Sequence, residues 1–106
     1  MLELRTREHL RRLEELLRQQ DLWADTPPDV SALASTAPFA CDTLAFEQWL
    51  QFIFLPRMYA LLEAGHTLPA DIAIAPMAFH VWQHQPERVA LIQLLNDLDT
   101  LLNEPR

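Results

Sequence analysis

Apolar residues recur at intervals of three and four along much of the chain, which is the spacing of a helix with one buried face. Residues 2–21 show this pattern with charged residues on the opposite face. Residues 87–103 repeat it as a leucine stripe, and Pro86 suits the start of that helix. A shorter apolar segment, residues 76–83, begins with proline in the same way. The pattern therefore predicts three helices at least partly exposed to solvent.

The segment between them, residues 42–64, is apolar on nearly all sides, so we expect a helix that is buried on most sides. Asp42 suits its N-cap, where the carboxylate accepts from free backbone N–H groups. Gly65 suits the left-handed position that ends a helix. Pro56 cannot donate to the carbonyl of Phe52, which predicts a kink or a break.

The remaining segments read as connections. Residues 23–38 contain three prolines, with one helical turn allowed at 28–33, and Trp23 is expected to cover an end of the core. Residues 68–75 form the second connection. Nothing alternates as a strand would, and 106 residues suit one core. The prediction is a single all-α domain over residues 1–106, an irregular four-helix bundle with a kinked, largely buried central helix.

Composition narrows the function classes. The chain has no lysine and one glycine, which excludes a P-loop, a dinucleotide fingerprint and Schiff-base chemistry. The formal charge is −7: residues 1–20 carry five Arg against four Glu, and the rest carries three Arg against eleven acidic residues. This acidic body disfavours nucleic-acid binding and favours a basic protein partner. No apolar run is long enough to span a bilayer, no signal peptide is visible, and Cys41 is the single cysteine, so we expect a cytoplasmic protein.

The candidate chemistry is sparse. His80 and His84 have the i,i+4 spacing of metal ligands, but a third ligand would have to come through the fold from His66, His9 or Cys41. We therefore expect no cofactor or metal. Cys41 before a helix start is a weak candidate for a reactive thiol, and a buried apolar role is favoured.

Three further groups of polar residues have structural interpretations. We expect His9 to be a core histidine with a satisfied hydrogen bond, since it falls in the apolar stripe of the first helix. Asp97 and Asp99 lie two apart, point in different directions and are expected on a solvated face. An arginine ridge on the first helix is expected to be a solvated, salt-bridged face rather than an acidic-partner site; it comprises Arg7, Arg11 and Arg18.

One surface remains as a candidate for interaction. Phe39, Asp42, Trp49, Pro56 and Arg57 combine aromatic side chains with an arginine, the residue types that anchor protein interfaces. The alternative is structural: the two aromatic residues belong to the core, Asp42 is a cap and Arg57 pairs with an acid.

The chain resembles the YqcC-like family of small bacterial proteins, found mostly in gammaproteobacteria. The resemblance runs nearly end to end. It is carried, in chain order, by Trp23, Ser35-Thr36-Ala37-Pro38-Phe39, Asp42-Thr43, Trp49-Leu50-Gln51, Leu55-Pro56-Arg57-Met58, Leu68-Pro69 and Ile74-Ala75-Pro76. It implies a helical bundle of unassigned function. Family members are often encoded beside a tRNA pseudouridine synthase, and some carry that enzyme's name, but such synthases are larger mixed α/β proteins. His80 and His84 are outside the family pattern.

Together these observations favour a non-enzymatic helical interaction module, an accessory to an RNA-modifying protein. A small-ligand or metal-binding protein is the alternative, using a pocket beside Pro56 or the pair His80 and His84. Self-association through a wide apolar helix face is a third hypothesis.

Overall fold

The computed structural model describes residues 2–104, and within that range the regular structure is entirely helical. The prediction of an all-α fold is confirmed. The elements in chain order are α1 (Leu2–Gln19), α2 (Val30–Leu33), the 3-10 turn η1 (Pro38–Ala40), α3 (Phe46–Trp49), the π-helical segment η2 (Leu50–Phe54), α4 (Leu55–Ala64), α5 (Ala75–Trp82), the 3-10 turn η3 (Pro86–Arg88) and α6 (Val89–Asn103).

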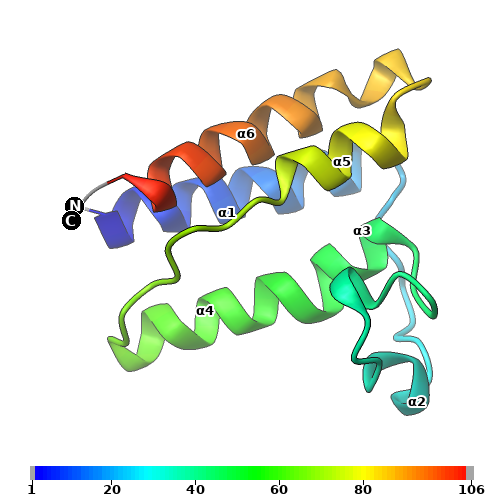
Figure 1. Cartoon of the computed structure of the whole chain (residues 1–106), viewed down its shortest axis with the longest axis horizontal. Helices are drawn as coiled ribbons and strands as arrows, with labels where there is room; N and C mark the ends of the chain where they lie inside the picture. The colour runs from blue at the N-terminus through cyan, green and yellow to red at the C-terminus, as the bar shows by residue number, and fades with distance from the viewer. Residues whose placement is uncertain (1, 105–106) are drawn as a thin grey trace.

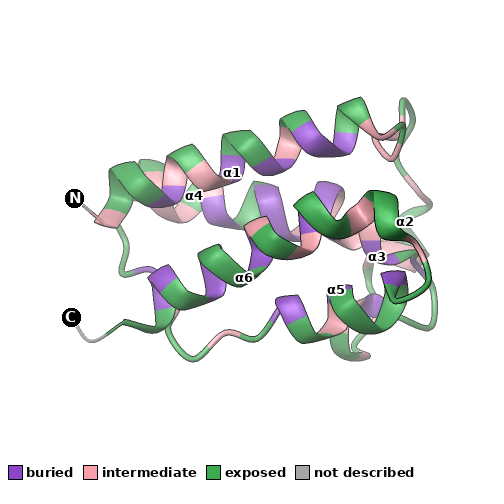
Figure 2. Cartoon of the chain, turned by 90° about the horizontal axis from the view of Figure 1, so that it is seen from above, coloured by how far each residue is buried: buried purple, intermediate pink, exposed green. Residues whose placement is uncertain are grey.

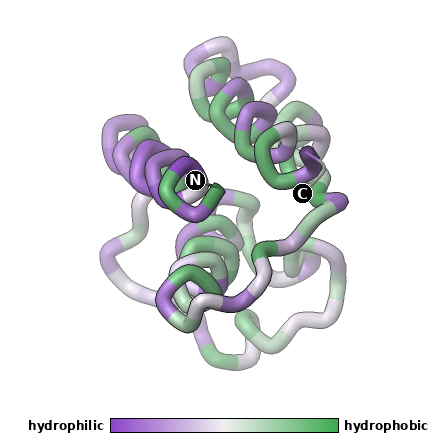
Figure 3. Tube along the Cα trace, turned by 90° about the vertical axis from the view of Figure 1, so that its left-hand side faces the viewer, coloured by the Kyte–Doolittle hydropathy of each residue, from purple (hydrophilic) through white to green (hydrophobic). Residues whose placement is uncertain are grey.

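The long helices form an antiparallel bundle. In Figure 1, α6 runs back along α1, α5 lies beside α6, and α4 lies across from them with α3 at its start. Each long helix turns leucine or aromatic side chains inward, so the buried residues form one core between the helices (Figure 2). The view along the bundle shows α1, marked by N, as the most hydrophilic of the long helices (Figure 3). This one-sided burial is the packing that the sequence pattern predicts.

The central helix is continuous from Phe46 to Ala64 because α3, η2 and α4 follow one another without a gap. Its irregularity is the π-helical segment, where the N–H of Leu55 donates to the carbonyl of Leu50 instead of the α-helical partner. A proline removes one α-helical hydrogen bond, and a wider turn just before Pro56 accommodates that loss. Residues 46–55 are all buried or half-buried, so the predicted burial on most sides holds for this half of the helix.

The start of the central helix differs from the prediction. Asp42 is not its N-cap: the helix begins at Phe46, and Ala45 occupies the capping position. The side-chain oxygen of Gln48 accepts the N–H of Ala45 at 3.0 Å. Residues 41–44 instead form a turn, in which the N–H of Leu44 donates to the carbonyl of Ala40.

Two helices end in the same backbone motif. Gly65 has φ 69°, and the N–H of His66 donates to the carbonyl of Leu61, as the prediction of a left-handed stop at Gly65 requires. At the end of α1, Asp21 adopts φ 58° and the N–H of Leu22 donates to the carbonyl of Leu17. Both are Schellman motifs, which satisfy the last carbonyls of a helix.

Asp99 corrects another prediction. It is 8% exposed, so it does not belong to a solvated face, whereas Asp97 is exposed as expected. One carboxylate oxygen, Oδ2, accepts the N–H groups of Ile74 at 2.9 Å and Ala75 at 2.8 Å. Asp99 on α6 therefore satisfies the free donors at the start of α5 and fixes that helix against its neighbour.

His9 and Trp23 can be compared with their sequence interpretations. His9 is only half-buried and does not belong to the core, but the expected hydrogen bond is present: its Nδ1 lies 2.7 Å from the carbonyl oxygen of Arg5. Trp23 packs against the core, and the guanidinium of Arg18 lies 4.4 Å from the centre of its ring. No helix within residues 2–104 combines the length and apolar character needed to cross a membrane.

Candidate interaction groove

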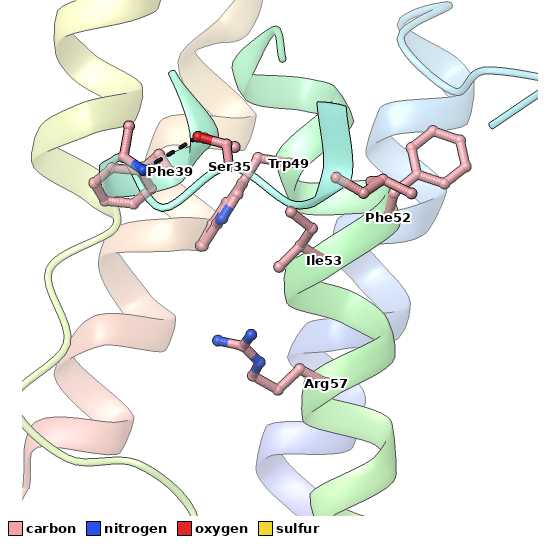
Figure 4. A pocket seen from close by; sticks show the side chains of 9 residues that line it. Ser35, Phe39, Trp49, Phe52, Ile53 and Arg57 are labelled. Carbon is pink, nitrogen blue, oxygen red and sulfur yellow. Dashed lines mark hydrogen bonds between the residues drawn. The ribbon is translucent and has the colours of Figure 1, made fainter. Parts of the chain in front are cut away.

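A cavity of about 530 Å³ opens between the loop that carries η1 and the exposed side of the central helix. Ser35 and Phe39 lie on the loop side, while Trp49, Phe52, Ile53 and Arg57 lie on the helix side (Figure 4). Trp49, Ile53 and Arg57 follow one another at four-residue intervals, so they share one face of the helix. We call this cavity the 35–57 groove.

Aromatic contacts build the inner part of the groove. The rings of Phe39 and Trp49 meet edge to face with centroids 4.8 Å apart. Trp49 also stacks on Phe54 at 5.4 Å and on Phe46 at 6.1 Å. Phe46 and Phe54 are buried, whereas Phe39 and Trp49 are only half-buried. Phe39 and Trp49 are therefore anchored in the core on one side and exposed to the groove on the other.

The loop side of the groove has an unusual backbone. Phe39 and Ala40 adopt φ 57° and 49°, in the left-handed region that non-glycine residues seldom occupy. Such conformations cost about 1–3 kcal/mol each and concentrate at ligand sites and switch regions. Here they turn the chain sharply enough for the ring of Phe39 to reach Trp49.

Hydrogen bonds hold this loop in place. The hydroxyl of Ser35 donates to Asp42 Oδ1 at 2.5 Å and accepts the N–H of Ala37 at 3.1 Å. The hydroxyl of Thr43 donates to the carbonyl of Ala32 at 2.8 Å. Asp42 thus closes the loop instead of capping the helix.

Arg57 is the only charged side chain among those that line the groove. It is exposed, and Figure 4 shows its guanidinium directed toward the open side below Trp49. The alternative expectation, that Arg57 pairs with an acid, is not met: within residues 2–104 no carboxylate lies in ion-pair range of it. Its guanidinium donors are available to an external group.

The structure therefore brings together three of the five candidate residues: Phe39, Trp49 and Arg57. Asp42 lies outside the lining and acts through its bond to Ser35. Pro56 is exposed and does not line the groove. Sequence reasoning missed Ser35, Phe52 and Ile53; the four-residue spacing of Ile53 between Trp49 and Arg57 was the available signal.

Two side chains with shifted pKa values, Asp99 and Tyr59, lie outside the groove. Burial raises the pKa of the Asp99 carboxyl, and its backbone hydrogen bonds oppose that shift. Burial, assisted by the Glu14 carboxylate, raises the pKa of Tyr59, while Arg11 and Arg7 oppose it. Neither Asp99 nor Tyr59 lines the 35–57 groove, so the groove itself is characterised by its shape and by Arg57.

The residues considered for a metal or a thiol do not assemble. α5 ends at Trp82, so His84 lies beyond the helix and does not continue the i,i+4 repeat from His80. Among the residues that the structure describes, no three His, Cys, Asp or Glu side chains gather as a metal site requires. Cys41 is exposed, so the favoured expectation of a buried apolar role is wrong. It lies in a turn five positions before Phe46, where the helix begins, so the premise of a helix N-terminus beside it is wrong as well.

Comparison with known proteins identifies relatives that are similar in sequence over most of the chain. A protein of Haemophilus influenzae, described only as uncharacterized, is 41% identical over 98 residues, which is 92% of each chain. The uncharacterized protein YqcC of Escherichia coli K12 is 36% identical over 98 residues, 92% of this chain and 90% of that one. The chain belongs to the YqcC-like family.

A solved structure supports the same family assignment and the same fold. The solution NMR structure of E. coli YqcC matches with a TM-score of 0.87 at 33% identity, covering 99% of this chain and 91% of that one. The predicted fold of this YqcC-like chain is thereby confirmed. The matching family profile, over residues 5–101, is that of a domain of unknown function described as tRNA pseudouridine synthase C.

One relative of the YqcC-like chain is much longer. A protein of Pectobacterium carotovorum named tRNA pseudouridine synthase C is 45% identical over 67 residues, which is 63% of this chain and 18% of that protein. Most of that relative therefore lies outside the YqcC-like match.

Proposed function

We propose that this YqcC-like chain is a non-enzymatic protein-interaction module and an accessory to a tRNA pseudouridine synthase. The observation that carries the proposal is the longer relative, in which a segment matching this chain is part of a polypeptide named tRNA pseudouridine synthase C. A domain found within a larger protein in one species, and as a small chain in another, is a natural candidate to bind the rest of that protein.

The geometry of the 35–57 groove supports the proposal. Half-buried aromatic side chains next to an arginine are typical of the centre of protein interfaces. Phe39 and Trp49 are fixed by their core contacts, so little side-chain freedom is lost when a partner covers them. The formal charge of −7 also favours a protein partner with basic surface over direct binding to RNA.

The experiment mixes the purified chain with the tRNA pseudouridine synthase C of the same organism and measures association by calorimetry and light scattering. We expect a stoichiometric complex. We also expect the chain alone to form no pseudouridine in tRNA, and to change the kcat/KM of the synthase when added to it.

Variants locate the contact. Arg57→Glu should weaken the complex at least about tenfold, because a hydrogen bond to a charged group is worth roughly 1.5–3 kcal/mol. Arg11→Glu on α1 is the matched control, since it makes the same change of charge at an exposed residue that does not line the groove. No association at concentrations where both proteins are folded, or pseudouridine formation by the chain alone, would overturn the proposal.

A further inference from the structure

The 35–57 groove has a chemistry that selects its occupant. We propose that it binds an extended peptide segment in which an apolar side chain lies next to a carboxylate, with the carboxylate paired to Arg57. This inference rests on the proposed function, because it specifies the kind of segment that the partner protein contributes. It goes further in naming the chemistry of recognition at particular residues.

The apolar side chain of the proposed peptide is inferred from the residues on the helix side of the groove. Trp49, Phe52 and Ile53 are half-buried, so each leaves part of an apolar surface open to the cavity. A cavity of about 530 Å³ is within the usual range of about 300–1,000 Å³ for ligand sites and has room for a few side chains of a peptide. An apolar side chain placed against Trp49 and Ile53 would complete their burial.

The carboxylate half follows from Arg57. Its guanidinium is one helical turn beyond Ile53, faces the open side of the groove and has no ion-pair partner within residues 2–104. Covering the groove with an uncharged segment would remove water from Arg57 without replacing its hydrogen bonds, which is costly. A carboxylate matches the planar guanidinium with two parallel hydrogen bonds and removes that cost.

An RNA strand fits these observations less well. Aromatic side chains and one arginine can stack bases, but tracking a phosphate backbone takes a row of Lys and Arg residues. Arg57 is the single cation in the lining, and the chain as a whole has a formal charge of −7. Charge therefore favours an occupant that brings one isolated carboxylate over one that brings a phosphate at every step.

The backbone conformation of the loop at Phe39 and Ala40 also supports binding of a ligand in the groove. Phe39 and Ala40 are consecutive left-handed residues, and the ring of Phe39 packs against Trp49. Strain of this kind persists where the surrounding structure fixes it and is concentrated at ligand clamps. Ser35 and Asp42 fix the loop by their hydrogen bond, so the groove exists before its occupant arrives.

The test is selection of short random peptides displayed on phage against the immobilised chain, followed by titration of the selected peptides in solution. We expect enriched sequences to place Asp or Glu next to a large apolar residue. Arg57→Gln should weaken their binding at least about tenfold, by loss of a charge-assisted pair. Arg57→Glu should reverse the selection toward Lys and Arg, which a merely structural role of Arg57 would not produce. Arg11→Gln should leave both the selection and the affinity unchanged.

Several outcomes would overturn the inference. These are selection without any enriched sequence, equal binding of the enriched peptides to Arg57→Gln, and an Arg57-dependent affinity for single-stranded oligouridylate that exceeds that of the peptides. Thermal unfolding of each variant confirms that it is folded, as the exposed position of Arg57 leads us to expect.

The peptide test does not involve the synthase, so the two proposals can fail separately. Arg57-dependent peptide binding without a synthase complex would support the proposed peptide recognition in the groove and would contradict the accessory role. A synthase complex whose affinity is unchanged by Arg57→Glu would support the accessory role and would exclude the 35–57 groove as its contact surface.

Discussion

Gln51 and Ala24 are joined by two hydrogen bonds that mimic a pair of strands: the N–H of Ala24 donates to Gln51 Oε1 at 2.8 Å, and Gln51 Nε2 donates to the carbonyl of Ala24 at 2.9 Å. Asn103 makes the same pair of bonds with Ile72, both at 2.7 Å. Each amide side chain thus attaches a connecting segment to a helix. These bonds hold Ala24 and Ile72 at points where the connections have no regular structure.

The amide at position 51 should therefore matter for stability. Gln51 is 7% exposed, and Gln51→Leu would leave both backbone groups of Ala24 without their partner. We expect a loss of about 1–3 kcal/mol in the free energy of unfolding, measured by urea denaturation. Gln93→Leu is the control, because Gln93 is exposed and its side chain donates one exposed hydrogen bond, to Asp97; its effect should stay within about 0.5 kcal/mol. Equal losses of stability in Gln51→Leu and Gln93→Leu would contradict a stabilising role of the two Gln51–Ala24 hydrogen bonds.

The two Schellman motifs predict substitutions of opposite sign. Asp21→Gly should raise the free energy of unfolding by about 0.5–1 kcal/mol, since glycine adopts the left-handed conformation freely and a negative charge leaves the C-terminal end of α1. Gly65→Ala should lower it by about 1 kcal/mol. An added Cβ at Gly65 would meet nothing within 4 Å, so the cost comes from the backbone alone. Both changes can be read as shifts of the melting temperature.

Asp21→Asn separates the two contributions at position 21, because asparagine removes the charge and retains a side chain. Its melting temperature should fall between those of the natural chain and Asp21→Gly. A Gly65→Ala protein as stable as the natural chain would show that the left-handed stop contributes nothing there.

Asp99 should give the bundle a measurable dependence on pH. Burial raises its pKa in the folded state, so the folded chain binds the proton more tightly than the unfolded chain. Between the two pKa values stability then falls as pH rises, and this contribution is present on the acid side and lost toward neutral pH. Relative to Asp99→Asn, the natural chain should therefore gain stability as pH is lowered through the folded pKa.

The hydrogen bonds of Asp99 supply a second comparison. Asp99→Asn keeps an oxygen acceptor for the N–H groups of Ile74 and Ala75, whereas Asp99→Leu removes it. At neutral pH we expect Asp99→Leu to cost about 1–3 kcal/mol more than Asp99→Asn. A difference between Asp99→Asn and the natural chain that stays constant with pH would contradict the shifted titration.

Asp42 should affect binding more than folding. Its carboxylate holds the hydroxyl of Ser35 at an exposed position, so Asp42→Ala should change the free energy of unfolding by less than about 1 kcal/mol. Loosening the loop should nonetheless weaken the synthase complex severalfold. Asp97→Ala is the matched control, because Asp97 is also exposed and also accepts one side-chain hydrogen bond. Equal affinities for the two variants would remove Asp42 from the site.

The long helices could be predicted from the sequence because apolar residues recur in each at helical spacing, and because a proline or glycine marks one end of α4, α5 and α6. The left-handed position of Gly65 could be predicted for the same reason. The equivalent position of Asp21 could not, since aspartate there carries no such signal. Asp99 was recognisable: it lies four residues after Leu95 and three before Leu102, within the buried stripe of α6.

The groove was predictable only in part. Aromatic and arginine residues in one segment identified Phe39, Trp49 and Arg57, because tryptophan and arginine are enriched among the residues that dominate protein interfaces. The role of Asp42 depends on a loop that brings it to Ser35, seven positions earlier. Local sequence favours a helix cap at such a residue, and only tertiary contacts decide between the two.

The N-terminal end of α1 and the C-terminal end of α6 lie at the same end of the bundle, while the loop of residues 35–40, which forms one side of the 35–57 groove, lies at the other (Figure 1). Sequence joined to either end of such a bundle would start at the end away from residues 35–40. The proposed accessory role is therefore compatible with a bundle that is a separate chain and with one that, as in the longer Pectobacterium relative, is part of a larger polypeptide.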